Sequence, residues 1–178
     1  MRHVPAVCLA SLGSIASLLS SGCSSASAQT SSGTTVVSAF AAYRYDADSG
    51  YTPVSLPSDG SLGDVMTLST GGRHTGPLVT TFPARLIVTG TAYLHNGDTS
   101  ERSIQCKLQL RPAGGAAQDV TFLSYDSLAQ YDNRTWTQTT GLDVAPGTYD
   151  LALLCSTGLA NPGGRVFYAD LTVTAHSH

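Results

Sequence analysis

Two aspartates separated by one residue, Asp46 and Asp48, precede Ser49 and Gly50. Alternating acidic side chains before a glycine turn are typical of the start of a calcium loop, because a hard cation needs several converging oxygens. The complete EF-hand pattern also has a third oxygen residue before the glycine and a distal glutamate, which are missing here. Calcium binding at Asp46 and Asp48 is therefore one interpretation, and a solvated polar turn, which the missing ligands favour, is the other.

Histidines provide the next candidates. His176 and His178 could together hold a copper, nickel or zinc ion, but a chain terminus is usually disordered unless it docks. We expect residues 176–178 to form such a tail. His74 lies in the glycine-rich run 71–76, and no strand-to-helix pattern accompanies it. Phosphate binding at this run is therefore not expected.

The sequence contains no motif typical of a hydrolytic enzyme. There is no Gly-x-Ser-x-Gly elbow, and no serine or cysteine has a recognisable spacing to His95, which ends a predicted strand. A catalytic triad stays open, since its members converge in space rather than in sequence. Glu101 is the only glutamate, so a glycosidase would have to use aspartates.

One group of side chains could serve such an enzyme. Asp126 and Asp132 stand beside three aromatic residues that could line a sugar platform, Tyr125, Tyr131 and Trp136. At strand spacing, however, aromatic residues more often pack in the core or against a neighbouring strand. We favour that structural role for them.

The first thirty residues indicate export. Arg2 and His3 give a positive start, and residues 4–19 are apolar or small and carry no charge. This is the layout of a cleaved signal peptide. The run falls short of the ~20 apolar residues that a membrane span needs.

Two cleavage sites compete. Residues 19–23, Leu-Ser-Ser-Gly-Cys, resemble the lipobox of bacterial lipoproteins, in which Cys23 would be lipidated after removal of residues 1–22. The leucine lies one place further from the cysteine than in the usual pattern. The alternative is a small-x-small site that removes residues 1–28 and leaves Gln29 first. We favour the lipoprotein site because it follows the apolar run directly, and residues 29–33 then form part of a flexible linker.

The remaining chain is long enough for one domain, which we expect over residues 34–175. Charged residues are 12% of the chain, and loss of Arg2 leaves eight basic against twelve acidic residues. No basic cluster is present, so nucleic acid is not an expected partner.

Period-two alternation dominates this part of the sequence and predicts strands. Residues 103–111 place Ile104, Cys106, Leu108 and Leu110 on one face, and residues 148–156 do the same with Tyr149, Leu151, Leu153 and Cys155. Both cysteines fall on an apolar face, and the exported chain has no other pair. We therefore predict a core disulfide between Cys106 and Cys155.

The other predicted strands complete an all-β fold. Residues 85–95 and 167–175 alternate clearly, the latter with Phe167 facing inward, and weaker patterns cover residues 34–43, 64–69, 78–82, 119–125 and 135–142. Glycine and proline turns separate them. About nine short strands predict an antiparallel β-sandwich or jelly roll. Residues 45–63 are expected to form a long surface loop.

Four segments carry a family resemblance: ARLIVTGTAYLHNGD, SIQCKLQL, APGTYDLALLCSTG and ADLTVTA. Their order is similar to that in small exported bacterial proteins with a jelly roll resembling the C1q and tumour-necrosis-factor domains. The likeness covers residues 77–175 and rests on Asn96, Gly97, Cys106, Pro146, Gly147, Cys155, Leu171 and Val173. It implies a binding or surface module without catalysis that tends to form a homotrimer.

Three functions are consistent with these patterns. The first is an exported, non-catalytic β-sandwich that binds an unknown extracellular ligand or assembles with itself. The second is a small extracellular hydrolase acting on carbohydrate through aspartates. The third is an anchored structural lipoprotein. The scarcity of histidine and glutamate favours the first.

Overall fold

The computed structural model describes residues 34–39, 53–70, 76–158 and 163–177. Contacts divide the chain into two units, Met1–Gly33 and Thr34–His178, and all described residues belong to the second. These described residues form eleven strands and no helix. Accordingly, no described segment is a helix capable of spanning a membrane.

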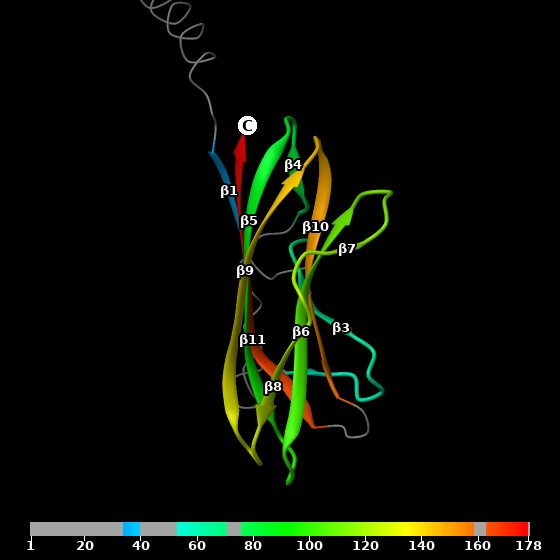
Figure 1. The fold of residues 1–178 in the computed structure, drawn as a ribbon, viewed down its shortest axis with the longest axis vertical. Coiled ribbons are helices and arrows are strands. Elements are labelled where there is room, and N and C mark those ends of the chain that lie inside the picture. The colour runs from blue at the N-terminus through cyan, green and yellow to red at the C-terminus, as the bar shows by residue number, and fades with distance from the viewer. Residues whose placement is uncertain (1–33, 40–52, 71–75, 159–162, 178) are drawn as a thin grey trace, which may run out of the picture. The chain divides into compact units, whose positions relative to one another are not determined.

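The first sheet, which we call sheet A, contains five antiparallel strands (Figure 1). Its order is β1–β11–β5–β9, and the short β2 also pairs with β11. The strands are β1 (Thr34–Ala39), β2 (Val54–Ser55), β5 (Ala84–Asn96), β9 (Asn133–Val144) and β11 (Gly164–Ser177). β9 therefore forms one edge of sheet A.

The second sheet, sheet B, has six antiparallel strands and faces sheet A (Figure 1). β10 and β6 form its centre; β3 and β4 pair with β10, and β7 and β8 pair with β6. The strands are β3 (Gly63–Thr67), β4 (Leu78–Thr80), β6 (Arg102–Pro112), β7 (Gln118–Asp119), β8 (Ser124–Leu128) and β10 (Gly147–Thr157). The two sheets confirm the predicted antiparallel β-sandwich.

The core lies between the sheets and is built from the predicted apolar faces. The inward residues of β6 and β10 are buried, as are those of β5. Gly90 of β5 allows the sheets to approach, because a Cβ at this position would lie 2.5 Å from Cδ2 of Leu108. Burial of both facing sheets supplies the hydrophobic stabilisation that the fold requires.

Asn96 organises one end of the sandwich. It is fully buried at the end of β5. Its Nδ2 donates to the carbonyl oxygens of Ser100 and Ala129 at 2.7 and 2.9 Å, with that of Leu128 at 3.2 Å. Its Oδ1 accepts from the Asp98 amide at 3.0 Å. This single side chain therefore ties the β5–β6 turn to the end of β8.

The prediction of a single strand over residues 119–125 is wrong. The structure divides it into β7 and β8, with residues 120–123 between them. The Leu108 amide donates to Oγ1 of Thr121 at 2.8 Å, so a side-chain hydroxyl takes the place of a ladder carbonyl. The Val120 amide still donates to the Leu108 carbonyl. The segment stays close to β6 without being a regular strand.

The predicted inward position of Phe167 is also wrong. The register of β11 against β5 shifts between Val166 and Tyr168, which leaves Phe167 as the extra residue of a β-bulge. Val166 is buried instead, and the Phe167 ring lies 6.5 Å from that of Tyr93. An inserted residue reverses which side chains face the core.

The outer face of sheet B is more buried than its sequence predicts. Gln105, placed on the wet face of β6 by alternation, is buried and donates from Nε2 to Oγ of Ser156 at 2.6 Å. Ala152 and Leu154, on the same face of β10, are buried as well. The predicted loop over residues 45–63 also contains β2, while its residues 45–52 lie outside the described part.

Candidate functional site

Most of the metal-site candidates fall outside the described residues. This holds for Asp46, Asp48, His74 and His178. His176 lies within β11, which continues to Ser177, so the predicted tail is part of sheet A up to that residue. In the described ranges, no three His, Cys, Asp or Glu side chains come together as a metal site. Calcium binding at Asp46 and Asp48 stays a prediction.

The remaining histidine candidate, His95, is held by an amide and a phenyl ring. Its Nδ1 lies 2.8 Å from Oδ1 of Asn133. Its ring packs edge-on against Phe167 with centroids 5.1 Å apart. Neither neighbour is a nucleophile. These contacts therefore hold the His95 ring in place on the outer face of sheet A and do not connect it to a catalytic group.

The three aromatic residues that were weighed as a sugar platform do not form one surface. Trp136 is buried, and its Nε1 donates to Oγ of Ser124 at 2.5 Å. Tyr125 and Tyr131 are exposed instead. Trp136 therefore has the core role that strand spacing favours.

The two aspartates of this group have structural partners. Asp126 lies 3.6 Å from Nη1 of Arg134. Asp132 accepts a hydrogen bond from the Asn133 amide at 2.8 Å and thereby caps the start of β9. Both carboxylates are therefore engaged at the β8–β9 connection.

The disulfide predicted from alternation is present. Cys106 and Cys155 are bonded, lie directly opposite each other on β6 and β10, and are fully buried. The bridge thus joins two strands that are already hydrogen-bonded neighbours. It fixes their register as well as their proximity.

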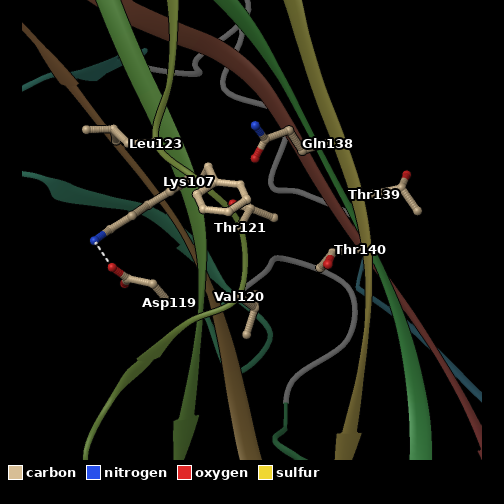
Figure 2. A pocket seen from close by; sticks show the side chains of 9 residues that line it. Lys107, Asp119, Val120, Thr121, Leu123, Gln138, Thr139 and Thr140 are labelled. Carbon is tan, nitrogen blue, oxygen red and sulfur yellow. Dashed lines mark hydrogen bonds and ion pairs between the residues drawn. The ribbon is translucent and has the colours of Figure 1, made fainter.

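A cleft lies where the two sheets open, beside β9 (Figure 2). Its volume is about 590 Å³, within the usual range of ligand sites. We call it the edge cleft; it is lined by residues 120–123, by residues 138–140 of β9, and by Lys107 and Asp119. Phe122, one of its lining residues, is 93% exposed. An exposed phenyl ring beside a cleft is suited to contact another molecule.

The position of the cleft relative to β9 follows from its lining. Gln138, Thr139 and Thr140 are consecutive, and their side chains alternate between the two faces of sheet A. Gln138 and Thr140 point to one side of β9, and Thr139 points to the other (Figure 2). The cleft therefore meets β9 at the inward side chains of Gln138 and Thr140. No other strand in the described part of the chain pairs with the edge of β9 that faces away from β5.

Gln138 is the least satisfied polar residue of the cleft. Its side chain reaches from β9 toward the segment that contains Thr121 and Leu123 (Figure 2). Its Oε1 is buried and has no hydrogen-bond partner among the described residues. Leaving such an acceptor unpaired costs roughly 1–3 kcal/mol. Gln138 is therefore the polar side chain at which hydrogen bonding around the cleft is least complete.

The two charged residues that line the cleft, Lys107 and Asp119, form an ion pair with no net charge. Nζ of Lys107 lies 2.7 Å from one oxygen of Asp119, and Nε2 of Gln109 donates to the other at 3.1 Å. The hydrogen bond from Lys107, aided by Gln109, lowers the pKa of Asp119 below its ordinary value. Asp119 is therefore an ionised, engaged carboxylate rather than a proton donor near neutral pH.

Sequence reasoning missed this site for identifiable reasons. Phe122 fell inside a predicted strand, where an aromatic side chain is expected to pack. Gln138 looked like one polar residue in a threonine-rich strand. The observable signal was the alternation of β9, which places Gln138 on the same face as buried Trp136.

Comparisons with known proteins identify the fold. No protein-family model matches the chain, and no curated protein matches its sequence. A chain of the T13 infectious bursal disease virus particle is similar over 80% of this chain and 31% of its own, with 14% identity and a TM-score of 0.53. A chain of the Gt strain of that virus matches with 12% identity over 81% of this chain and 32% of its own, at a TM-score of 0.52.

A third similar structure is Eiger TNF from S. frugiperda, with 13% identity over 68% of this chain and 83% of that chain, at a TM-score of 0.44. The present chain spans about a third of the length of the viral chains. At these identities the likeness concerns the fold alone. The jelly-roll sandwich expected from the sequence is thereby confirmed.

Proposed function

We propose that this protein is an exported, non-catalytic β-sandwich that binds another molecule in the edge cleft. The observation that carries the proposal is the edge cleft itself, which has the exposed ring of Phe122 beside it and is lined on β9 by Gln138. The Oε1 of Gln138 is buried and lacks a donor among the described residues. Native proteins pair almost all such atoms. An exposed phenyl ring and an incompletely bonded amide at one cleft support a binding role for it.

The carboxylates of the cleft favour binding over hydrolysis. Glycosidases use two acidic residues, one of which holds a proton near neutral pH. Among the described residues that line the edge cleft, Asp119 is the only carboxylate, and Lys107 lowers its pKa. The hydrolase remains the alternative, with Asp126 and Asp132 as its remaining candidates.

Export is supported by the signal-like first residues and the core disulfide. A buried bridge between Cys106 and Cys155 is typical of proteins that fold in an oxidising compartment. We propose a surface lipoprotein anchored through Cys23, with free secretion from Gln29 as the alternative. A purely structural lipoprotein would leave the edge cleft without a ligand.

Self-association is the second component of the proposal. The outer face of sheet A carries uncharged threonines in neighbouring strands, such as Thr89, which lies 2.9 Å from Thr139 between their hydroxyl oxygens. The threonine part of this face is desolvated without burying charge, whereas Arg85 and Asp143 form an ion pair further along the same two strands. The family resemblance implies that three chains associate into a homotrimer. Light scattering of the delipidated domain over a hundredfold concentration range decides between one chain and three.

Binding and turnover are separated by one set of assays. The domain is applied to a glycan array and to a displayed peptide library, and it is incubated with a panel of hydrolase substrates. We expect saturable binding to one ligand class, reduced by Phe122→Ser, without turnover. Turnover that is lost in Asp126→Asn or Asp132→Asn would overturn the binding proposal in favour of the hydrolase.

A further inference from the structure

We propose that the ligand of the edge cleft is an extended peptide of a partner protein, which adds to sheet A as a strand beside β9. This inference rests on the proposed binding function and names the chemical class of its ligand. It predicts that main-chain hydrogen bonds to β9, rather than side-chain contacts alone, hold the ligand.

The shape of the site favours a strand. β9 is twelve residues long and is an edge of sheet A. Its edge carries alternating amide and carbonyl groups, which another extended chain can pair with. Residues 138–140 of this strand line the edge cleft. An extended peptide that pairs with the unpaired edge of β9 would therefore pass beside the cleft.

Two side chains would provide selectivity. Gln138 lines the cleft with a side-chain amide, a group that can donate and accept hydrogen bonds. Phe122 presents an exposed ring on the opposite wall of the cleft. Because successive side chains of a strand point in opposite directions, one peptide can place a polar donor at Gln138 and an apolar residue at Phe122.

The charges of the site predict an uncharged peptide. Lys107 and Asp119 neutralise each other at the cleft, 2.7 Å apart. Along β9, residues 135–142 carry no ionisable side chain. A charged residue of the peptide would be desolvated here without a partner, which is unfavourable. β9 also lacks the lysine and proline residues that usually protect an exposed edge from pairing.

The test uses a phage-displayed library of random dodecapeptides, panned against the biotinylated wild-type domain. Serum albumin serves as the background target. We expect enriched peptides that are uncharged at their centre and rich in β-branched or aromatic residues. One enriched peptide is then synthesised with an N-methyl group at each position in turn. Methylation at every second residue should abolish binding, because an N-methyl group removes the amide donor and strand pairing has period two.

Variants of the cleft connect the peptide to this site. Gln138→Leu and Phe122→Ser should each weaken peptide binding by about tenfold through loss of a hydrogen bond or an apolar contact. Gln130→Leu and Tyr125→Ser are the matched controls, since both residues are exposed and neither lines the cleft. The controls should bind like the wild type. Circular dichroism and thermal unfolding establish that each variant is folded.

Several outcomes overturn the inference. They are the absence of enrichment, binding that the two cleft variants do not weaken, and sensitivity to N-methylation without a two-residue period. Binding of a saccharide in place of peptides would also overturn it, yet would leave the proposed binding function standing. A domain that self-associates through β9, with assembly lost in Phe122→Ser, would identify a second copy as the occupant and overturn the partner peptide.

Discussion

Arg111 of β6 and Asp64 of β3 form a two-bond ion pair across β10, the strand that lies between theirs. Nη1 and Nη2 of the arginine lie 2.7 and 2.6 Å from the two carboxylate oxygens. The hydrogen bonds that Arg111 donates to Asp64 raise the pKa of Arg111 above its ordinary value. The pair passes over the face of β10 on which Ala152 and Leu154 are buried.

The first prediction concerns the energy of this pair. A double-mutant cycle with Arg111→Met and Asp64→Asn should give a coupling of about 0.5–1 kcal/mol in urea unfolding, because both side chains are partly exposed. High salt should reduce it. A cycle between Asp64 and Arg165, which lie on different sheets, is the control and should show no coupling. Equal coupling in both cycles would refute a direct interaction.

The second prediction concerns acid. Lys107 lowers the folded-state pKa of Asp119, and Arg102 lowers that of Asp98. A carboxylate with a lowered folded pKa stabilises the protein above its unfolded pKa, near 4, and loses that contribution as the pH falls through the folded value. The free energy of unfolding should therefore decline with acidification below about pH 4.

Substitution identifies the groups responsible for this decline. Asp119→Asn and Lys107→Met should each flatten the pH dependence measured by urea unfolding, since both remove the same pair. The two together should do no more than Asp119→Asn alone, because Gln109 still lowers the pKa of Asp119 in Lys107→Met. A wild-type slope in Asp119→Asn would show that this pair does not contribute.

The third prediction concerns the disulfide. Titration of the denatured, unreduced domain should detect neither Cys106 nor Cys155 as a thiol. Their separation of 49 residues predicts that the double variant Cys106→Ala, Cys155→Ala loses about 4 kcal/mol of stability. Chemical denaturation of the wild type and the variant measures this loss. Two free thiols in the unreduced wild-type domain would contradict the bridge.

The fourth prediction concerns Asn96. Replacing it with alanine should lower the free energy of unfolding by about 2–3 kcal/mol, since the carbonyl and amide groups that it satisfies would stay buried or become strained. Asn133→Ala, at an exposed position on the neighbouring strand, is the control and should cost about 0.5 kcal/mol or less. Similar losses in the two variants would argue against the organising role of Asn96.

The fifth prediction concerns anchoring. If Cys23 is lipidated, Cys23→Ala should move the protein from the membrane fraction to the medium, because the acyl chains supply the membrane affinity. Fractionation followed by immunoblotting measures the distribution. Unmutated protein in the medium with Gln29 at its N-terminus would support ordinary secretion instead.

The strongest alternating segments were predictable from sequence, and the irregular ones were not. Every second residue of β6 and β10 is apolar over most of their length, so period two identified both strands and the parity of Cys106 and Cys155. The bulge at Phe167 and the hydroxyl of Thr121 that replaces a carbonyl depend on cross-strand contacts. Such contacts do not leave a periodic signal in either strand alone.

The edge cleft could not be predicted from the sequence, for a related reason. Its walls, residues 120–123 and 138–140, come together only through the strand order. The pattern of β9 shows which side chains face inward, but it does not show that the strand is an edge. The lack of a donor for the buried Oε1 of Gln138 likewise depends on which groups surround it in space.

The bridge between Cys106 and Cys155 closes a covalent ring that contains both walls of the edge cleft. An extracellular protease that cuts once within residues 107–154, for instance in the exposed turn at 113–118, would leave the two pieces joined through sulfur. Release of any fragment of this ring would require a second cut or a reductant. The region around the cleft is therefore tolerant of a single nick in the environment where the protein is proposed to act.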